Sequence, residues 1–437
     1  MLVDKTTLHD LSIFHHDEEQ SIFHHLDFTQ TNGGREKLRK ILSHPLDNIQ
    51  AITDIQKAIR QLTTILSVWP STITNGTIMV VEKFFDTPLE SFPSGASLPE
   101  CLYYKIINGS DYSLTKYSLE HFIVFFKGLH QITVLLAKTE SKQLATIVSR
   151  IEMLLKNSNV SEMVHWDKEK KLSPVDIVSL GRFIKLHFDQ KSLELIDIYN
   201  RLDAYVSCAI ACEKFAFAFP EFEESTSPFV DVDNLFHLQL QMPVAYTIKL
   251  NKEKNFLFLT GANMGGKSTF IKAMGLAVYL AHIGMGVPAK EMRLSLFDGI
   301  LSNIQVADNI TKGESFFFNE VQRIKSTVEK ISDGKKWLIL IDELFKGTNQ
   351  QDAVKCSITV IEGLRKMSNG IFILSTHLYE IGEALKEYSN IQFRYFETNI
   401  KNDQLEFSYL LKEGIRQDRL GYLILKREGV VDLLESL

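Results

Sequence analysis

The residues with the clearest chemical potential form a glycine-rich loop in the second half of the chain. The loop has the spacing GxxxxGKS and ends in Lys267 and Ser268. Glycines let such a loop turn its backbone N–H groups inward around phosphate oxygens, while the lysine reaches the β- and γ-phosphates and the serine hydroxyl binds Mg²⁺. The spacing therefore predicts a site for ATP and Mg²⁺. The predicted nucleotide-binding residues here are Gly261, Ala262, Asn263, Met264, Gly265, Gly266, Lys267, Ser268 and Thr269.

Two acidic residues, Asp342 and Glu343, follow the apolar run 338–341. An aspartate at this distance after a phosphate loop is typical of a Mg²⁺ site, in direct or second-sphere contact. Glu343 is then placed to orient or deprotonate an attacking water. A kinase acting on a metabolite would not require this second acid, so the pair favours hydrolysis.

A histidine, His377, ends the next apolar run. It could contact the γ-phosphate or the water, and the alternative is a purely structural histidine. Its order after the loop and the acidic pair favours the catalytic role.

These residues need a scaffold that brings strand ends together. Short apolar runs at 255–260, 337–341 and 371–375 predict buried strands, and helical patterns fill 267–282, 316–332, 351–367 and 378–387. Strands that alternate with helices and are apolar almost throughout indicate a parallel α/β sheet. Segments 391–398 and 404–411 predict a hairpin.

The first half of the chain has a different character. Apolar residues recur there at three- and four-residue spacing, which predicts helices at 35–43, 48–67, 116–137, 141–157 and 189–217. Prolines and polar residues cluster at 219–229, so we expect a boundary there, with a helical domain at 1–228 and an ATPase domain at 229–437.

Composition narrows the class of protein. The chain has 437 residues, a formal net charge of -6 and 23% charged residues, which is ordinary globular composition without the basic bias of a dedicated nucleic-acid module. The four cysteines are too few and too scattered for a disulfide framework. Because the sequence shows neither a signal peptide nor a charge-free membrane span, we expect a cytoplasmic protein.

Taken together, the three motifs resemble those of the MutS family of DNA mismatch-repair ATPases, within the wider ABC-type group. The Asn-Met pair inside the loop is that family's particular mark, Asp342 and Glu343 resemble its Walker B acids, and the sequence Ser-Thr-His ending at His377 resembles its histidine switch. The resemblance implies an ABC-type P-loop NTPase fold in the second half, preceded by a mainly α-helical core and lever domain. The segment 32–46 is similar to the start of that helical core, which is the weaker match.

The segment 306–316 is similar to the family's signature loop, which reaches into the nucleotide site of a partner subunit. Ser315 would then meet the γ-phosphate in trans, which implies a homodimer with two composite sites. The plainer interpretation is an ordinary helix N-cap at Ser315, and both can hold. Lys346 stands where the family usually has arginine, which keeps the charge but loses bidentate geometry.

The resemblance implies a MutS-related ATPase that binds and hydrolyses ATP as a dimer and uses the cycle to act on DNA. The sequence offers no counterpart of the family's mismatch-reading and connector domains, so backbone or shape recognition of DNA is the expectation. The alternative is a nucleotide-switched interaction protein that acts on a protein partner rather than DNA. A small-molecule kinase would leave Glu343 and His377 unexplained. Phe236 and His237 lie near the region expected to contact adenine, but the sequence does not decide between them.

Overall fold

The structure is a computed structural model that describes residues 1–89, 92–93, 95, 97–167, 170–262, 264–304, 316–401, 404–416, 425 and 429–435. Its backbone contacts divide the chain into two compact units. Unit 1 comprises Met1–His25, His44–Ile52 and Lys214–Leu437, and unit 2 comprises Leu26–Ser43 and Thr53–Glu213.

This division differs from a single boundary at 228/229, because two N-terminal segments pack within the unit that contains the large sheet. Strand β1 (Leu2–Val3) pairs in parallel with β7 (Gly299–Asn303). The backbone N–H of Leu46 donates to the carbonyl of His282. Local helical periodicity carries no information about such long-range partners.

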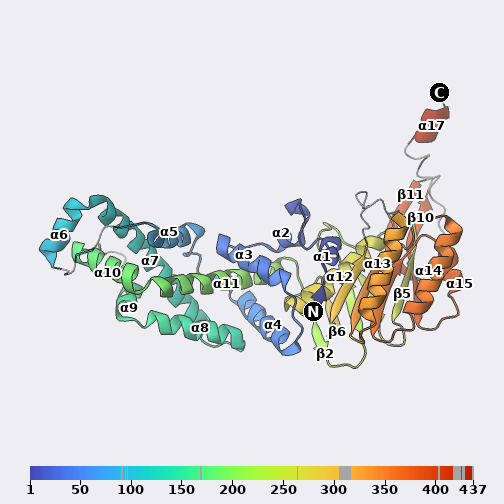
Figure 1. The fold of residues 1–437 in the computed structure, drawn as a ribbon, viewed down its shortest axis with the longest axis horizontal. Helices are drawn as coiled ribbons and strands as arrows, with labels where there is room; N and C mark the ends of the chain where they lie inside the picture. Colours follow the sequence, from blue (N-terminus) through green and yellow to red (C-terminus); the bar gives the residue numbers. More distant parts are fainter. Residues whose placement is uncertain are drawn as a thin grey trace. The chain divides into compact units, whose positions relative to one another are not determined.

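Unit 2 is helical (Figure 1). Its helices are α3 (Asn32–Ser43), most of α4 (Ile49–Thr64), α5 (Asn75–Asp86), α6 (Leu98–Ile107), α7 (Gly109–Leu135), α8 (Lys142–Leu155), α9 (Ser158–Val164), α10 (Pro174–His187) and α11 (Asp189–Lys214). The predicted helices in this half are confirmed with shifts at their ends. The sequence analysis missed α5, α6, α9 and α10.

The core of unit 2 is rich in phenylalanine. The ring of Phe122 on α7 lies 5.7 Å from that of Phe84 on α5 and 5.8 Å from that of Phe126, and all three side chains are buried. Burial of each such ring contributes about 1.5–3 kcal/mol. The long helix α7 therefore organises the unit, with α5, α8, α9 and α10 packed against it.

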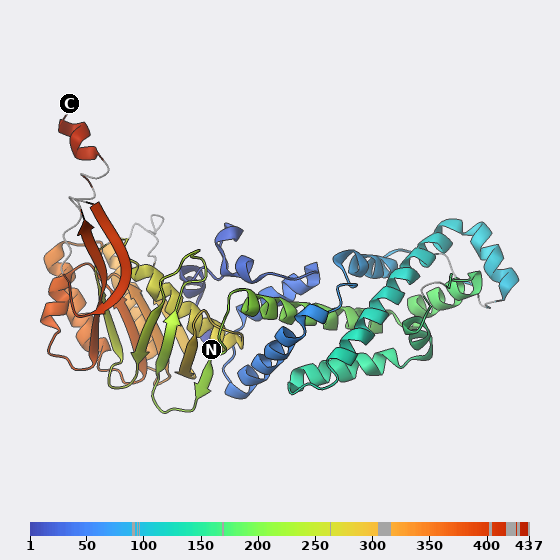
Figure 2. The same cartoon turned by 180° about the vertical axis from the view of Figure 1, so that it is seen from behind.

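Unit 1 is built on a seven-stranded sheet in the order β1-β7-β8-β9-β5-β10-β11. The further strands are β5 (Phe256–Thr260), β8 (Trp337–Asp342), β9 (Gly370–Ser375), β10 (Ile391–Lys401) and β11 (Gln404–Glu413). Neighbouring strands are parallel except for the antiparallel β10–β11 hairpin, which Figure 2 shows in red. The predicted parallel sheet and hairpin are confirmed.

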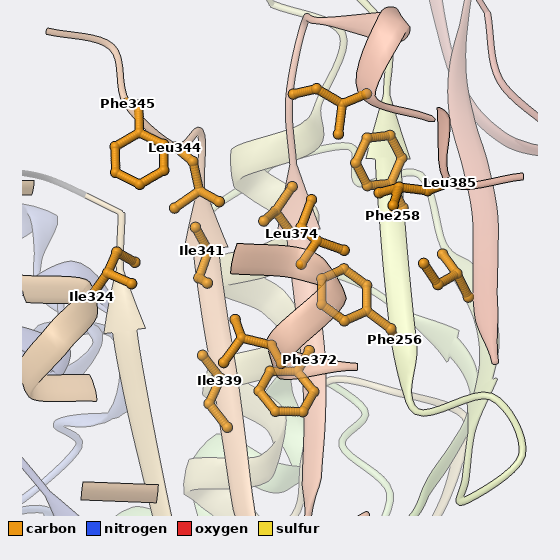
Figure 3. Packing of buried hydrophobic residues seen from close by; sticks show 14 of the residues in the cluster. Phe256, Phe258, Ile324, Ile339, Ile341, Leu344, Phe345, Phe372, Leu374 and Leu385 are labelled. Carbon is orange, nitrogen blue, oxygen red and sulfur yellow. The ribbon is translucent and has the colours of Figure 1, made fainter. Parts of the chain in front are cut away.

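Helices cover both faces of this sheet. The helices are α12 (Lys267–Ile283), α13 (Phe316–Ile331), α14 (Gln350–Leu364) and α15 (Tyr379–Ala384). Side chains alternate between the faces of a strand, so Phe256 and Phe258 of β5 join the same core as Ile339 of β8 and Phe372 of β9 (Figure 3). Residues of α13, α14 and α15 complete that core.

Helix α12 lies on the opposite face. A Cβ added at Gly275 of α12 would come within 2.5 Å of a methyl carbon of Leu340, whose side chain points away from that of Ile339. Because both faces are covered, the central strands are apolar at nearly every position, as the sequence indicated.

A second, four-stranded sheet in the order β2-β6-β3-β4 was not predicted (Figure 2). Its strands are β2 (Glu221–Glu223), β3 (Val230–Leu235), β4 (Tyr246–Leu250) and β6 (Glu291–Ser295). The β4 side chains alternate between buried and exposed, and the ring of Tyr246 lies 5.3 Å from that of Phe270 on α12. The sheet thus packs one face against the N-terminal part of α12.

The remaining described elements are short. They are α1 (Lys5–Asp10) and α2 (Ile22–Leu26) near the N-terminus, α17 (Val430–Glu435) near the C-terminus, and single 3₁₀ turns at Glu18–Gln20 and Leu66–Val68. In the part of the chain that the structure describes, no helix combines the length and apolar character needed to span a bilayer.

Candidate nucleotide site

The glycine-rich loop joins β5 directly to α12, in the order that the sequence predicted. Gly261 has a φ of 129° and Gly266 a φ of 105°, values that residues with a Cβ rarely adopt. Close packing also favours glycine at position 261, because a Cβ there would lie 3.1 Å from the carbonyl oxygen of Phe396. The loop therefore delivers the N-terminus of α12, with its unpaired N–H groups and positive dipole end, to one edge of the sheet.

Lys267 folds back onto this loop. Its Nζ donates to the carbonyl oxygens of Gly261 at 2.6 Å and Ala262 at 2.9 Å, and its side chain is only 6% exposed. An ammonium carries three donors and costs free energy when removed from water, so these carbonyls hold the charge beside the loop.

Asp342 joins three elements at the same edge. Its Oδ2 accepts a hydrogen bond from Ser268 Oγ at 2.5 Å, and its Oδ1 accepts from Ser375 Oγ. The register of β8 and β9 explains the second contact, since Asp342 pairs directly with Ser375. The parallel strands thus bring the end of β8 beside the first turn of α12.

The oxygens of Ser268 and Asp342 form a donor set that suits Mg²⁺. A hydroxyl and a carboxylate are the hard oxygen ligands that this ion prefers, and their separation allows both to be neighbouring ligands of one ion. These are the two metal ligands that the sequence suggested, and the structure brings them together.

Glu343 follows immediately, in a left-handed backbone conformation with a φ of 63°. Its N–H donates to the carbonyl of Ser375 at 3.0 Å. Its Oε1 lies 3.0 Å from Nδ1 of His377, and its Oε2 lies 3.3 Å from Nζ of Lys346. Burial alone would raise the pKa of Glu343, but the hydrogen bond from His377 and the charges of Lys346 and His377 outweigh it and lower that pKa to about 2.

A cavity of about 570 Å³ opens beside these groups. Its volume lies in the range typical of small-ligand sites. The polar part of its wall comes from the loop and the acidic pair, through Ala262, Met264, Gly266, Lys267, Ser268, Thr269, Asp342, Glu343 and Lys346. His377 does not line this wall, and its Nδ1 contacts the wall residue Glu343.

Another part of the cavity wall is largely apolar, and the sequence analysis did not predict it. It consists of Leu240, Met242, Val244, Tyr246 and Tyr409. Tyr409 also has a positive φ of 55°, and Met242 is 93% exposed. Phe236 and His237, the sequence candidates for an adenine contact, do not line this cavity. A positive φ cannot be predicted from the sequence, and Tyr409 lines the same cavity as Tyr246, which lies more than 150 positions earlier in the chain, so no local signal marked Tyr409.

Two predicted residues, Asn263 and Ser315, lie outside the described residues, as does the segment 306–315. The other predicted site residues converge on the cavity or directly behind it.

The strand, loop and helix order and the acids at the neighbouring strand tip define the class of P-loop α/β domains. Residues 257–432 match the family model described as MutS domain V. The DNA mismatch repair protein spellchecker 1 of Drosophila melanogaster is 31% identical over 229 residues, which cover 51% of this chain and 25% of that protein. The DNA mismatch repair protein MutS of Leptospira interrogans is 30% identical over 275 residues, which cover 60% of this chain and 32% of that protein.

These matches support membership of the chain in the MutS family, through the region that resembles MutS domain V. The aligned regions span about a quarter to a third of the length of these curated relatives.

Proposed function

We propose that this chain binds ATP with Mg²⁺ in the cavity beside α12 and hydrolyses it. The observation that carries the proposal is the bond between Ser268 Oγ and Asp342 Oδ2 at 2.5 Å, which joins the phosphate loop to the acidic strand tip. Those two segments are 74 positions apart in the sequence. Their meeting supports one pocket for the triphosphate and its metal ion.

Each polar group then has a separate task. Lys267 exchanges its loop carbonyls for oxygens of the β- and γ-phosphates, and the N–H groups at the start of α12 bind the same oxygens. Mg²⁺, held by Ser268 and Asp342, neutralises charge on the phosphates when it is bound. The apolar wall with Tyr246 and Tyr409 receives the base.

Glu343 orients the attacking water. Its pKa of about 2 keeps it ionised at neutral pH but makes it a weak base. Accepting a hydrogen bond from water is therefore better supported than full proton removal while the contacts with His377 and Lys346 persist. His377 holds the carboxylate through the contact of its Nδ1 with Oε1 of Glu343.

The test of this first proposal uses Asp342→Asn. The amide retains the shape but is a poor ligand for Mg²⁺, so we expect Mg²⁺-dependent ATP binding to weaken by at least about tenfold. ATP affinity measured with and without Mg²⁺, by titration calorimetry on parent and variant, decides the matter. Equal Mg²⁺ dependence in both proteins would contradict the assignment.

We propose further that two copies associate through their ATPase regions and complete each other's sites with the segment 312–316. The support is the family resemblance of that segment. Mass measurement by light scattering with and without ATP, on the parent and on Ser315→Ala, tests it. A fully active monomer would exclude a contribution in trans.

DNA is the substrate that we propose for the assembled protein. The support is family membership together with the two relatives, both named as DNA mismatch repair proteins. The net charge of -6 means that any DNA contact must come from a local surface. The decisive experiment is the ATPase rate measured with homoduplex, mismatched and branched DNA at 50 and 200 mM salt, where stimulation by one of them that falls with salt is expected.

A protein partner is the alternative, and one surface feature favours it. Helix α6 of unit 2 exposes five large apolar side chains: Leu98, Leu102, Tyr103, Ile106 and Ile107. Such a cluster is typical of a protein contact rather than of a phosphate-binding surface. Substitution of two of these apolar residues by a charged one, Tyr103→Glu and Ile106→Glu, should leave DNA-stimulated hydrolysis intact if DNA is the substrate.

A further inference from the structure

A buried glutamate outside the cavity, Glu320 on α13, contacts the loop that follows the acidic pair. Its side chain is only 3% exposed. Its Oε1 accepts a hydrogen bond from the backbone N–H of Lys346 at 3.1 Å, and its Oε2 accepts from that of Gly347 at 3.1 Å. Removing a carboxylate from water is costly, so two backbone donors on a different element are a specific arrangement rather than incidental packing.

The loop that Glu320 holds has an unusual backbone. Glu343 and Phe345 both adopt left-handed conformations, with φ values of 63° and 58°. Non-glycine residues keep such conformations only where the surroundings fix them. Glu320 supplies two charge-assisted bonds at the next two positions, and the ring of Phe345 lies 5.7 Å from that of Phe317 on the same helix.

This connection reaches the acid that faces the cavity. The backbone of Lys346 is held by Glu320, and the Nζ of Lys346 lies 3.3 Å from Oε2 of Glu343. Helix α13 thus fixes the backbone position of Lys346. Lys346 and His377 in turn fix the direction of the Glu343 carboxylate.

We infer that Glu320 is a positioning residue for Glu343, which acts by fixing the backbone at Lys346 and Gly347. The inference rests on the proposed hydrolysis of ATP. Glu320 does not itself line the cavity, and it contacts the wall residue Lys346 at the backbone N–H, so its loss should affect turnover more than nucleotide affinity. A displacement of a reacting group by about 1 Å can cost about 100-fold in rate, so even a small relaxation of this loop is measurable.

The experiment compares Glu320→Ala, Glu320→Asp and Glu320→Gln with a control on the same helix, Glu329→Gln, whose side chain is 66% exposed. For Glu320→Ala we expect kcat to fall about tenfold or more while KM stays within about threefold. Glu320→Asp keeps a carboxylate and should recover part of the rate. Glu320→Gln should recover less, because its NH₂ group would face one of the two N–H donors. The control should match the parent.

Two further measurements separate positioning from general destabilisation. Thermal unfolding shows whether the variant is folded at the assay temperature, and hydrogen exchange of the peptide 343–349 reports on the bonded amides. Faster exchange there, with a folded protein and retained ATP affinity, is expected for Glu320→Ala. A parent-like kcat in Glu320→Ala, or a loss of rate matched by equal loss of ATP binding, would overturn the inference.

Hydrogen exchange also distinguishes the two proposals. If the parent hydrolyses no ATP under any condition, the proposed function fails. In that case unchanged protection of the Lys346 and Gly347 amides in Glu320→Ala would independently refute the positioning role.

Discussion

The two units differ in where their backbone departs from its preferred conformations. Among the described residues, every non-glycine with positive φ belongs to unit 1: Ser12, Ala216, Asn234, Met264, Glu343, Phe345 and Tyr409. Three of these, Met264, Glu343 and Tyr409, line the cavity. Strain of this kind costs about 1–3 kcal/mol per residue and persists only where packing enforces it. The described backbone of unit 2 keeps to its preferred conformations. In unit 1, strained conformations at the cavity lower the free energy of unfolding but fix the geometry of the site.

Two lysines show the same contrast at the level of single side chains. Lys185 of unit 2 donates to the carbonyls of Phe84, Phe85 and Thr87, at 2.7, 2.9 and 2.9 Å, where helix α5 ends. Helix ends leave such carbonyls without partners, so this lysine serves the fold. Lys267 of unit 1 also binds carbonyls, but it does so in the wall of a cavity. Similar hydrogen bonds from lysine to backbone carbonyls thus serve the fold in unit 2 and the cavity in unit 1. Substitution of each lysine can distinguish the two roles.

The largest effect is expected for Glu343→Gln. The amide keeps the volume but loses the charge that orients water, so kcat should fall by about 10²–10³-fold with little change in ATP affinity. Single-turnover hydrolysis and ATP binding measure the two quantities. The matched control in unit 2 is Glu194→Gln, which removes the carboxylate that Arg150 binds at 2.5 Å. Equal loss of rate in both variants would erase the functional contrast between the units.

Lys267→Ala should have the next largest effect. It removes the cation next to the phosphate site, and we expect the Kd for ATP to rise by about 100-fold. Lys185→Met provides the reciprocal control, because it removes a half-buried lysine without touching the cavity. Calorimetric titration with ATP on both proteins compares them, and weakened ATP binding in Lys185→Met would show that the two sites are not independent.

The free energy of unfolding should respond in the opposite order, with a larger loss in Lys185→Met than in Lys267→Ala. Lys185→Met leaves three carbonyls at the end of α5 without their charged donor, so we expect unit 2 to lose about 2–3 kcal/mol of unfolding free energy. Urea unfolding followed by fluorescence of Trp69 and Trp166, in a background carrying Trp337→Phe, reports on unit 2. An unchanged midpoint would mean that water replaces the lysine at little cost.

The sequence predicted best those parts of unit 1 in which local pattern and function coincide. Strands β5, β8 and β9 are short apolar runs that lead into the glycine-rich loop, the acidic pair and His377, so both their position and their chemical role could be predicted. Asp342 and Ser268 follow from that pattern, and their bond at 2.5 Å confirms that they meet. The predicted helix ends were less accurate: α14 ends at Leu364 rather than 367, and α15 at Ala384 rather than 387.

Features that depend on long-range pairing could not be predicted in this way. The four-stranded sheet pairs Glu221–Glu223 with residues about 70 positions later, and the alternation of valine and aspartate in β3 covers only residues 230–233, too short a pattern to be recognised alone. The apolar cavity wall and the role of Glu320 have the same origin, since each depends on a contact between distant segments. The periodicity of apolar residues indicates which side of a helix or strand is buried, but it does not indicate which distant segment packs against that side.

The smallest expected effect is a difference in acid sensitivity, which sharpens the comparison between the units. His282 of unit 1 is fully buried; its Nδ1 donates to the carbonyl of Val278 at 2.9 Å and its Nε2 accepts from the N–H of Phe297 at 3.1 Å. Burial lowers the pKa of His282 from 6.5 to about 4. Between these two pH values the imidazole is protonated in the unfolded chain and neutral in the folded chain. The contribution of neutral His282 to the free energy of unfolding is therefore complete above pH 6.5, and it is lost as the pH falls toward 4.

From pH 8 to pH 5.5 this single histidine should lower the unfolding free energy of unit 1 by about 1–1.5 kcal/mol. Burial instead raises the pKa of Asp203 in unit 2, despite opposing hydrogen bonds from Gln30 and Thr31, so mild acid does not destabilise that unit through its buried carboxyl. Urea unfolding at the two pH values, followed through Trp337 after Trp69→Phe and Trp166→Phe, measures unit 1. In His282→Gln the pH dependence should shrink by that amount, whereas an identical dependence in parent and variant would assign the acid sensitivity to other groups.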